Sequence, residues 1–335
     1  MKRSLLLLLA ILITATYVAP SVYAFDGDEF ADAISYTCTL DEDTGKIVVD
    51  GTVHHDVMMK YPSYKIRLYA IAPGERLEDV INDSQRAPLA ETIMTIKFTF
   101  SISVKSSLER YSKYAVIFCS EDGKQYVAGT PKYPAVSSDF EYLSGDRSAY
   151  KGVLCDSSAL SFDVGAGLVV IDIDISRTRG DITDAILYPS NGEYITFSRA
   201  YVESLDKQIN SASVNGAKIY LRFLLDSSDE KLCVALTDDF QKRGFPNIYD
   251  EYTLGYISSL SKFLMDRYAD GIGKISGVIV GDRVDDIEHT NYVGDMSAER
   301  YAEAYVLYLS VIAGAMRMTD STLDIVIPVS DRDEY

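Results

Sequence analysis

Charged side chains cluster near the ends of two apolar segments of the chain. Asp172 and Asp174 alternate with isoleucines, which places both carboxylates on one face of a strand. Arg222 and Asp226 alternate with apolar residues in the next such segment. We expect Arg222 to pair with the two aspartates across a shared face. These four residues are candidate substrate-binding residues, together with Asp331 near the end of the sequence.

Asp282 and Arg283 form a second charged pair, directly after the apolar segment Gly277–Gly281. If Gly281 and Arg283 point to the same side of this strand, Asp282 points away from it. A guanidinium stays protonated throughout the physiological pH range and cannot act as a proton donor. We therefore expect Arg283 to make a structural ion pair with one of the two aspartates of the earlier strand.

The loop after Arg283 carries an acidic run that includes Asp285, Asp286 and Glu288. Such a run is usually a solvated surface, and a calcium site is the main alternative, so these three residues are only weak candidates for metal ligands. Three histidines and four cysteines without CxxC spacing do not predict a zinc site. We expect no cofactor.

The N-terminus has the organisation of a cleavable signal peptide. Lys2 and Arg3 precede an apolar run, Leu5–Leu12, that is too short to span a bilayer. Val22-Tyr23-Ala24 supplies the small residues that a signal peptidase recognises. We expect residues 1–24 to be removed and the mature chain, which has no membrane span, to be secreted or held at the cell surface. A retained membrane anchor is the alternative.

The chain is strongly acidic, with 50 Asp and Glu against 32 Lys and Arg and a formal net charge of −18. This charge repels nucleic acid and anionic lipid, so neither is an expected partner. Cys38 and Cys119 both lie in apolar segments of the first third of the chain. They form either a disulfide outside the cell or two buried free thiols.

Two regions of the chain differ in hydrophobic period. In residues 25–134, short alternating segments separated by Asp, Gly and Pro turns predict a β-sandwich of immunoglobulin or fibronectin type, a fold of about 100 residues. Gly129–Pro134 is expected to be the linker that ends this region. In residues 135–335, apolar strands alternate with long amphipathic helices, which predicts βα units and a parallel sheet.

A (β/α) barrel of the TIM type fits the second region better than an open doubly wound sheet. No glycine-rich phosphate loop follows the strand that ends at Ile175. Polar residues also recur at alternate strand positions, as on the lumen side of a barrel. A complete barrel typically needs about 250 residues. We therefore expect a barrel truncated after about five strands, with its remaining strands beyond residue 335.

Short motifs in the second region resemble glycoside hydrolases of the large TIM-barrel clan. Arg267-Tyr268 ends a predicted helix and Gly281-Asp282-Arg283 ends the next strand. The segment Asn291–Gly294 and the helix around Tyr301–Tyr305 follow. The order of these motifs is similar to that in a family of secreted bacterial proteins of unassigned function with a glycosidase-like barrel. The resemblance covers about residues 135–335.

The resemblance implies a Glu at the end of the fourth strand as general acid–base, opposite a carboxylate from the seventh strand. Arg283 occupies that fourth-strand position here, after Asp282 in place of an Asn. We therefore expect a secreted glycosidase-like protein that is catalytically impaired and binds carbohydrate or a cell-surface protein. One alternative is an active retaining glycoside hydrolase with displaced carboxylates or with catalytic residues in a missing C-terminus. The other is a structural or adhesive surface protein.

Overall fold

The computed structural model describes residues 30, 32–41, 44–83, 85–136, 152–155, 167–190, 193–239, 242–269, 273–288, 290–320 and 322–330. The chain divides into two compact units between Asp139 and Phe140. The predicted signal peptide and Asp331 lie outside the described residues. None of the helices that the structure describes combines the length and hydropathy that a membrane span requires.

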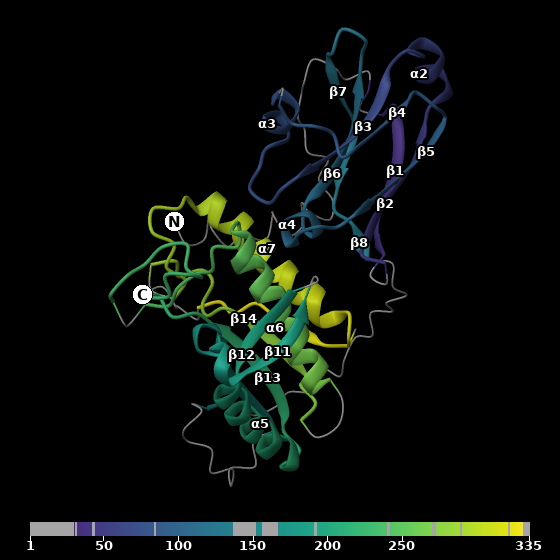
Figure 1. The fold of residues 1–335 in the computed structure, drawn as a ribbon. Coiled ribbons are helices and arrows are strands. Elements are labelled where there is room, and N and C mark those ends of the chain that lie inside the picture. Colours follow the sequence, from purple (N-terminus) through teal and green to yellow (C-terminus); the bar gives the residue numbers. More distant parts are fainter. Residues whose placement is uncertain are drawn as a thin grey trace. The chain divides into compact units, whose positions relative to one another are not determined.

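The first unit contains two four-stranded sheets, drawn in purple and blue in Figure 1. One has the order β5-β2-β1-β8, with β1 at Ile34–Asp41, β2 at Lys46–Val53, β5 at Lys97–Ser103 and β8 at Ala135–Val136. The other has the order β4-β3-β6-β7, with β3 at Lys65–Ile71, β4 at Ala90–Ile93, β6 at Lys113–Cys119 and β7 at Gln125–Lys132. Three short helices join them: α2 (His55–Lys60), α3 (Leu77–Asn82) and α4 (Ser107–Arg110).

Residues from both sheets form a shared hydrophobic core. β1, β2 and β5 contribute alternate side chains to it, whereas β6 is buried along nearly its whole length. Tyr36 on β1 links the sheets, since its hydroxyl bonds to the carbonyl oxygens of Tyr114 (2.9 Å) and Thr130 (2.7 Å). Cys38 and Cys119 are buried free thiols, so they do not form the disulfide considered above. Burial raises the pKa of the Cys38 thiol to about 12.

The prediction of a linker at Gly129–Pro134 is wrong for its first four residues, because β7 continues through Pro131 to Lys132. β7 lies at the edge of its sheet, where a proline does not remove a required hydrogen bond. Its register with β6 also shifts between Tyr114 and Val116. An edge strand with a register shift thus accommodates a residue that normally ends strand pairing.

The second unit is built on a five-stranded parallel sheet of the order β15-β14-β13-β10-β9. Its strands are β9 (Gly152–Cys155), β10 (Leu168–Asp174), β13 (Lys218–Leu224), β14 (Gly277–Val280) and β15 (Asp324–Val326). The spatial order of the strands is their order along the chain, and every neighbouring pair is parallel. Right-handed crossovers between such strands place the connecting helices on one face of the sheet.

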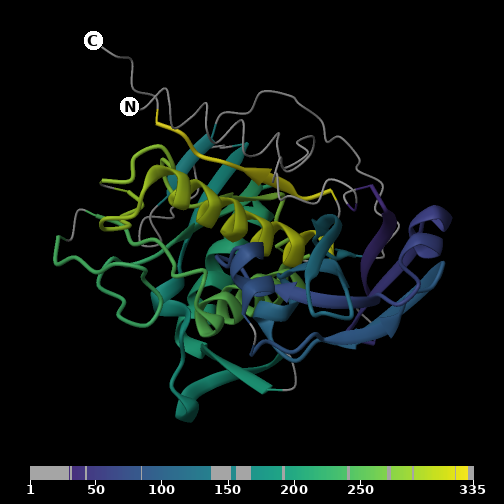
Figure 2. The same cartoon turned by 90° about the horizontal axis from the view of Figure 1, so that it is seen from above.

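The helices of this unit are α5 (Arg199–Val214), α6 (Glu251–Tyr268) and α7 (Ala298–Arg317). Figures 1 and 2 show α6 and α7 side by side. The strand residues on one face are fully buried and apolar: Val169, Ile171, Ile173, Ile219, Leu221 and Phe223. The residues between them on β10 and β13 are half-buried and include the charged side chains singled out above. The sheet therefore has one helix-covered face and one open face.

Local signals in the sequence explain where these helices begin and end. Ser198 precedes α5 and its Oγ accepts a hydrogen bond from the Tyr201 N–H, as expected for an N-cap. Ser297 caps α7 in the same way. Gly216 follows α5 with φ +71°, a conformation that glycine adopts readily.

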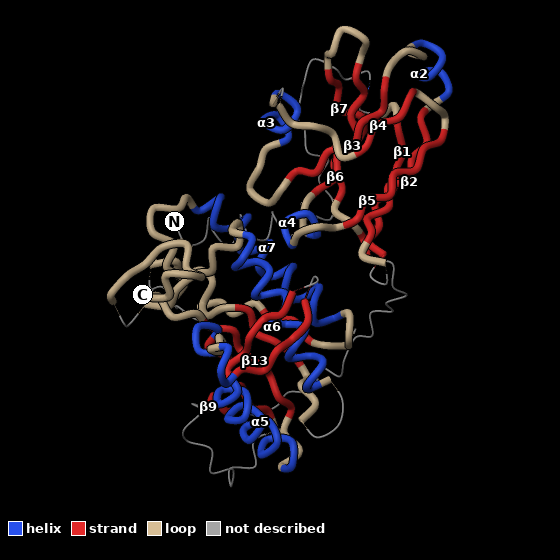
Figure 3. The backbone as a smooth tube through the Cα atoms, in the orientation of Figure 1, coloured by secondary structure: helices blue, strands red, loops and turns tan. Residues whose placement is uncertain are grey.

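Two short 3₁₀ helices, η2 (Ile175–Thr178) and η3 (Ile182–Asp184), follow β10. The antiparallel hairpin of β11 (Ala185–Ser190) and β12 (Glu193–Ser198) comes next and forms a separate two-stranded sheet. Figure 3 separates these red strands from the tan loop that connects β13 to α6. The Asn191-Gly192 pair between β11 and β12 lies outside the described residues.

The parallel sheet does not close into a barrel within the described residues, since β15 and β9 are its two edges. The sequence analysis also missed β9, a four-residue strand that pairs with the first half of β10. With β9 included, β14 is the fourth parallel strand of the unit. Asp282 and Arg283 therefore follow a fourth strand, as the motif order predicted.

Candidate functional site

The open face of the parallel sheet carries charged residues at the C-terminal ends of its strands. Asp172 on β10 lies directly opposite Arg222 on β13 in the parallel register. Both side chains project from the face that the helices do not cover, because their neighbours Ile171, Ile173 and Leu221 occupy the buried face. This edge of a parallel sheet is where ligands commonly bind in α/β proteins.

Arg222 connects three strands of this sheet. Its Nε and Nη2 donate to the two carboxylate oxygens of Asp172 at 2.8 and 2.9 Å, and its Nη1 donates to Asp282 Oδ1 at 3.5 Å. Burial disfavours the charged guanidinium, but the hydrogen bonds and charge of Asp172, with the charge of Asp282, outweigh it and raise the pKa of Arg222. The expected pairing of Arg222 with Asp172 is present. Its expected pairing with Asp174 is not.

The prediction that Asp282 points away from this face is wrong, and so is the predicted pairing of Arg283 with Asp172 or Asp174. Gly281 has φ +81° and Arg283 has φ +40°, so the strand alternation ends at Val280. The turn brings Asp282 back toward Arg222. Arg283 is about half exposed, and the carboxylate it approaches is that of Asp282, at 4.0 Å.

Buried hydrogen bonds hold the strained turn after β14. The side-chain amide of Asn291 donates to the carbonyl oxygens of Asp282 and Arg283. From α7, the Tyr301 hydroxyl donates to the Val284 carbonyl at 2.9 Å and the Tyr305 hydroxyl to the Val280 carbonyl at 2.8 Å. The left-handed conformation of Arg283 is therefore imposed by its surroundings.

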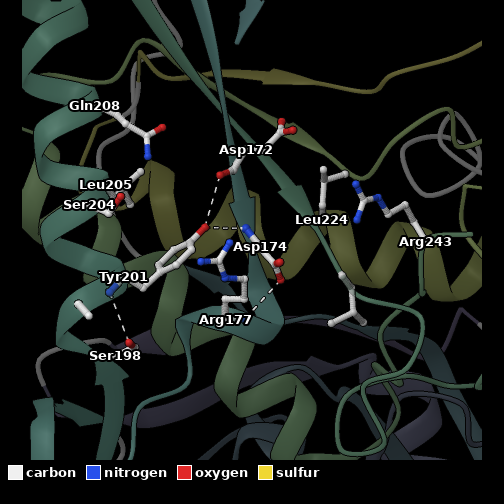
Figure 4. Close-up of a pocket in the computed structure, with 12 residues that line it drawn as sticks. Asp172, Asp174, Arg177, Ser198, Tyr201, Ser204, Leu205, Gln208, Leu224 and Arg243 are labelled. Carbon is white, nitrogen blue, oxygen red and sulfur yellow. Dashed lines mark hydrogen bonds between the residues drawn. The ribbon is translucent and has the colours of Figure 1, made fainter. Parts of the chain in front are cut away.

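A cavity of about 640 Å³ lies at the ends of β10 and β13, beside the first turns of α5. Figure 4 shows this cavity with α5 along one side of the view. Its polar lining comes from two strands, η2, α5 and the loop after β13. These residues are Asp172, Asp174, Arg177, Ser198, Tyr201, Ser204, Gln208 and Arg243. Sequence reasoning missed every lining residue except the two aspartates.

Tyr201 on α5 organises the wall of this cavity. β9 pairs with β10 only as far as Ile171, so the backbone groups of the following residues need other partners. The Tyr201 hydroxyl accepts a hydrogen bond from the Asp174 N–H at 2.8 Å and contacts the Asp172 carbonyl oxygen at 3.4 Å. Burial raises the pKa of the Tyr201 hydroxyl to about 12, so it remains a hydrogen-bonding phenol at neutral pH.

Asp174 lies in the cavity between two arginines, as Figure 4 shows. Burial raises the pKa of its carboxyl group. The charge of Asp226 acts in the same direction, whereas the Arg177 N–H, which donates to Oδ1 at 3.3 Å, and the charges of Arg177 and Arg243 oppose it. A carboxyl group with a raised pKa in a cavity is suited to donate a proton or a hydrogen bond.

Asp226 follows β13 and does not line the cavity. The backbone N–H and the hydroxyl of Ser228 donate to its Oδ1 at 2.9 and 2.8 Å. These hydrogen bonds lower the pKa of Asp226. The structure thus separates the predicted candidates: Asp172 and Asp174 line the cavity, Arg222 pairs with Asp172, and Asp226 lies outside the cavity.

The acidic run after Arg283 was expected to be a solvated surface, but its first part is buried. Asp285 and Asp286 are 8% and 4% exposed, and Asp285 accepts hydrogen bonds from the backbone N–H and the hydroxyl of Ser330. Glu288 is exposed. No group of three potential metal ligands occurs among the described residues.

A family profile matches residues 144–332, more than half of the chain. It describes DUF5722, a family of unknown function. The chain belongs to this family. No curated protein matches the chain. This DUF5722 chain has weak similarity to solved structures of glycoside hydrolases.

One of these is beta-glucuronidase 2 of Bacteroides uniformis covalently bound to cyclophellitol-6-carboxylate aziridine. It has 10% sequence identity and a TM-score of 0.29, over 88% of this chain and 32% of that one. A second beta-glucuronidase structure from Bacteroides uniformis has 11% identity, a TM-score of 0.29 and the same coverage. This chain therefore spans about a third of the length of those enzymes.

Proposed function

We propose that this protein is an exported, glycosidase-like carbohydrate-binding protein whose ligand occupies the cavity at the ends of β10 and β13. The observation that carries the proposal is the cavity itself. It lies at the C-terminal edge of a parallel sheet and offers carboxylates, guanidiniums, hydroxyls and an amide at one place. Sugar hydroxyl groups need this mixture of hydrogen-bond donors and acceptors.

The proposal includes a fold. Five parallel strands whose spatial order follows the chain have the topology of a (β/α) barrel, in contrast to the reversed strand order of a doubly wound sheet. We infer that residues 140–335 belong to such a barrel. The two sheets of the first unit, which include β8, correspond in this proposal to a β-sandwich. Residues 1–24 are the signal peptide that leads to export.

The proposal also includes loss of the usual glycosidase chemistry at β14. Arg283 stands where the motif order calls for the general acid–base, and a guanidinium cannot donate that proton. The backbone at Arg283 is in the left-handed region, which further separates this turn from an ordinary strand end. Binding without hydrolysis is the function that these residues support best.

Hydrolysis by displaced carboxylates is the second candidate, and the raised pKa of Asp174 is the observation that favours it. A half-buried carboxyl group with a raised pKa is suited to act as general acid. A panel of aryl glycosides tests this candidate directly. Turnover by the full chain that disappears in Asp174→Asn would establish hydrolysis, whereas no turnover of any glycoside would exclude it in favour of binding.

Glycan-array binding of the full chain tests the main proposal, with Asp174→Asn and Asp226→Asn as a matched pair. Both changes replace a carboxylate by an isosteric amide, but only Asp174 lines the cavity. We expect Asp174→Asn to weaken glycan binding about tenfold, the effect of one charge-assisted hydrogen bond. Asp226→Asn should change it by a much smaller factor, because Asp226 acts on Asp174 and Arg243 only from outside the lining. Equal losses in both variants, or no glycan bound at all, would contradict the proposal.

A further inference from the structure

We propose that the cavity recognises an acidic sugar and that Arg177 and Arg243 bind its carboxylate. The proposal rests on the carbohydrate-binding function above and adds the class of sugar. It follows from an imbalance of charge in the wall of the cavity. Asp172 is already neutralised by Arg222, so Asp174 is the remaining carboxylate of the lining against two guanidiniums. Asp226, outside the lining, acts on Asp174 and Arg243 through its charge.

Neither Arg177 nor Arg243 has a carboxylate oxygen within 4.0 Å among the described residues. Both arginines are exposed, so each is accessible to a ligand. The other arginines around this part of the sheet are matched to acids. The pairs are Arg179 with Asp229, Arg199 with Asp184, Arg222 with Asp172, and Arg267 with Asp206. Arg177 and Arg243, which have no such partner, both line the cavity.

Their positions favour a shared ligand. Arg177 lies against the ring of Tyr201, with its guanidinium carbon 5.6 Å from the ring centroid. Arg243 comes from the loop after β13, on the other side of Asp174 in the view of Figure 4. Both charges act on the pKa of Asp174, so both lie close enough to influence one small molecule in the cavity. The first turn of α5 borders the same space and adds positive potential.

A carboxylate is the anion that fits these donors together with the rest of the wall. The planar guanidinium binds a carboxylate through two parallel hydrogen bonds. Ser204 and Gln208 on α5 provide neutral partners for hydroxyl groups. A volume of about 640 Å³ lies within the usual range for sites that hold small ligands. A uronic acid residue offers both the carboxylate and the hydroxyl groups.

Calorimetric titration of the full chain tests this inference with matched ligands. The probes are oligosaccharides of glucuronic and galacturonic acid, the neutral oligosaccharides of glucose and galactose with the same linkages, and sodium acetate. We expect the acidic sugars to bind at least tenfold more tightly than the neutral ones. Arg177→Gln and Arg243→Gln should each reduce acidic-sugar affinity about tenfold, with little effect on neutral sugars.

Arg199→Gln is the control variant. It removes the same charge at the start of α5, but Arg199 pairs with Asp184 and does not line the cavity. Equal binding of acidic and neutral sugars, unchanged by the two cavity variants, would overturn the inference and leave the carbohydrate-binding function intact. Acetate binding as tight as that of the acidic sugars would overturn the assignment to a sugar. No binding of any sugar would refute the carbohydrate-binding function itself.

Discussion

Arg222 on β13 stands opposite Asp172 on β10 and holds both of its carboxylate oxygens, at 2.8 and 2.9 Å. The same guanidinium reaches Asp282 beyond β14. One side chain therefore ties together the ends of the second, third and fourth parallel strands. It also neutralises the carboxylate that borders the cavity on this side.

Replacing Arg222 by Leu should lower the free energy of unfolding by about 2 kcal/mol, because two half-buried carboxylates lose the charge that compensates them. Arg222→Lys should lose about half as much, since lysine keeps the charge without the bidentate geometry. Urea denaturation measures both. Arg199→Leu is the control: its ion pair is exposed and should contribute less than about 0.5 kcal/mol. A loss in Arg222→Leu no larger than in the control would contradict this prediction.

Asp174→Asn should stabilise the protein at neutral pH. The pKa of Asp174 is raised in the folded state, so the folded protein binds its proton more tightly than the unfolded chain. Ionisation of Asp174 therefore costs stability as the pH rises through its folded pKa, and this cost is absent at pH values below the ordinary Asp pKa. The measurement is denaturation of wild type and variant between pH 3 and pH 7, in steps of about one pH unit. The stability advantage of the variant should grow as the pH rises.

Asp226→Asn should have the opposite effect. Hydrogen bonds from Ser228 lower the pKa of Asp226, so its ionised form stabilises the fold above the ordinary Asp pKa, and this contribution is lost as the pH falls through the folded pKa. The variant should be less stable than wild type at neutral pH and equal to it in acid. The same pH series measures both variants. If the stability differences of both variants from wild type changed with pH in the same direction, the opposite pKa shifts assigned to Asp174 and Asp226 would be refuted.

Gly180→Ala should destabilise the second unit by about 2 kcal/mol. A Cβ at Gly180 would lie 2.6 Å from the backbone carbonyl carbon of Phe197, so β12 would have to move away. Gly314→Ala in α7 is the contrasting change, since nothing lies within 4 Å of its added Cβ. That variant should gain about 0.5–1 kcal/mol from helix propensity. Thermal denaturation of the two variants distinguishes these outcomes.

If residues 1–24 are the signal peptide proposed above, the exported protein should begin at Phe25. Intact mass measurement of the protein recovered outside the cytoplasm checks this start. Ala24→Arg places a large charged residue where the peptidase requires a small one, and it should leave the precursor uncleaved. The conservative control Ala24→Gly should be processed normally. A wild-type protein recovered only with Met1 at its N-terminus would contradict cleavage.

Regular alternation made part of the site predictable. Asp172 and Arg222 lie on long strands with a strict period of two, so their shared face follows from the sequence. Asp282 was misplaced because the alternation was continued through Gly281 and Arg283, whose positive φ values end the strand. An arginine carries no signal for that conformation. The surrounding bonds from Asn291 and Tyr305 impose it, and they become visible only in three dimensions.

The cavity arginines were missed for a different reason. Arg177 lies in a 3₁₀ turn and Arg243 in a long loop, and neither segment has a hydrophobic period that fixes the direction of a side chain. The sequence analysis did not single out Tyr201. Its role depends on β9 ending at Cys155, opposite Ile171 of β10, and β9 itself is too short to be recognised from four residues. One feature of the sequence could have pointed to a basic cavity wall. Two arginines flank Thr178, directly after a strand with two aspartates.

The polar residues of the cavity all lie between Asp172 and Arg243, whereas Asp282 comes later in the chain. During synthesis, β10, α5 and β13 therefore emerge from the ribosome before the last strands of the sheet. Because β10 and β13 are consecutive strands of this sheet, they can pair before β14 has been synthesised. We expect a nascent chain to acquire its binding wall first and the bond from Arg222 to Asp282 only after β14 has been made.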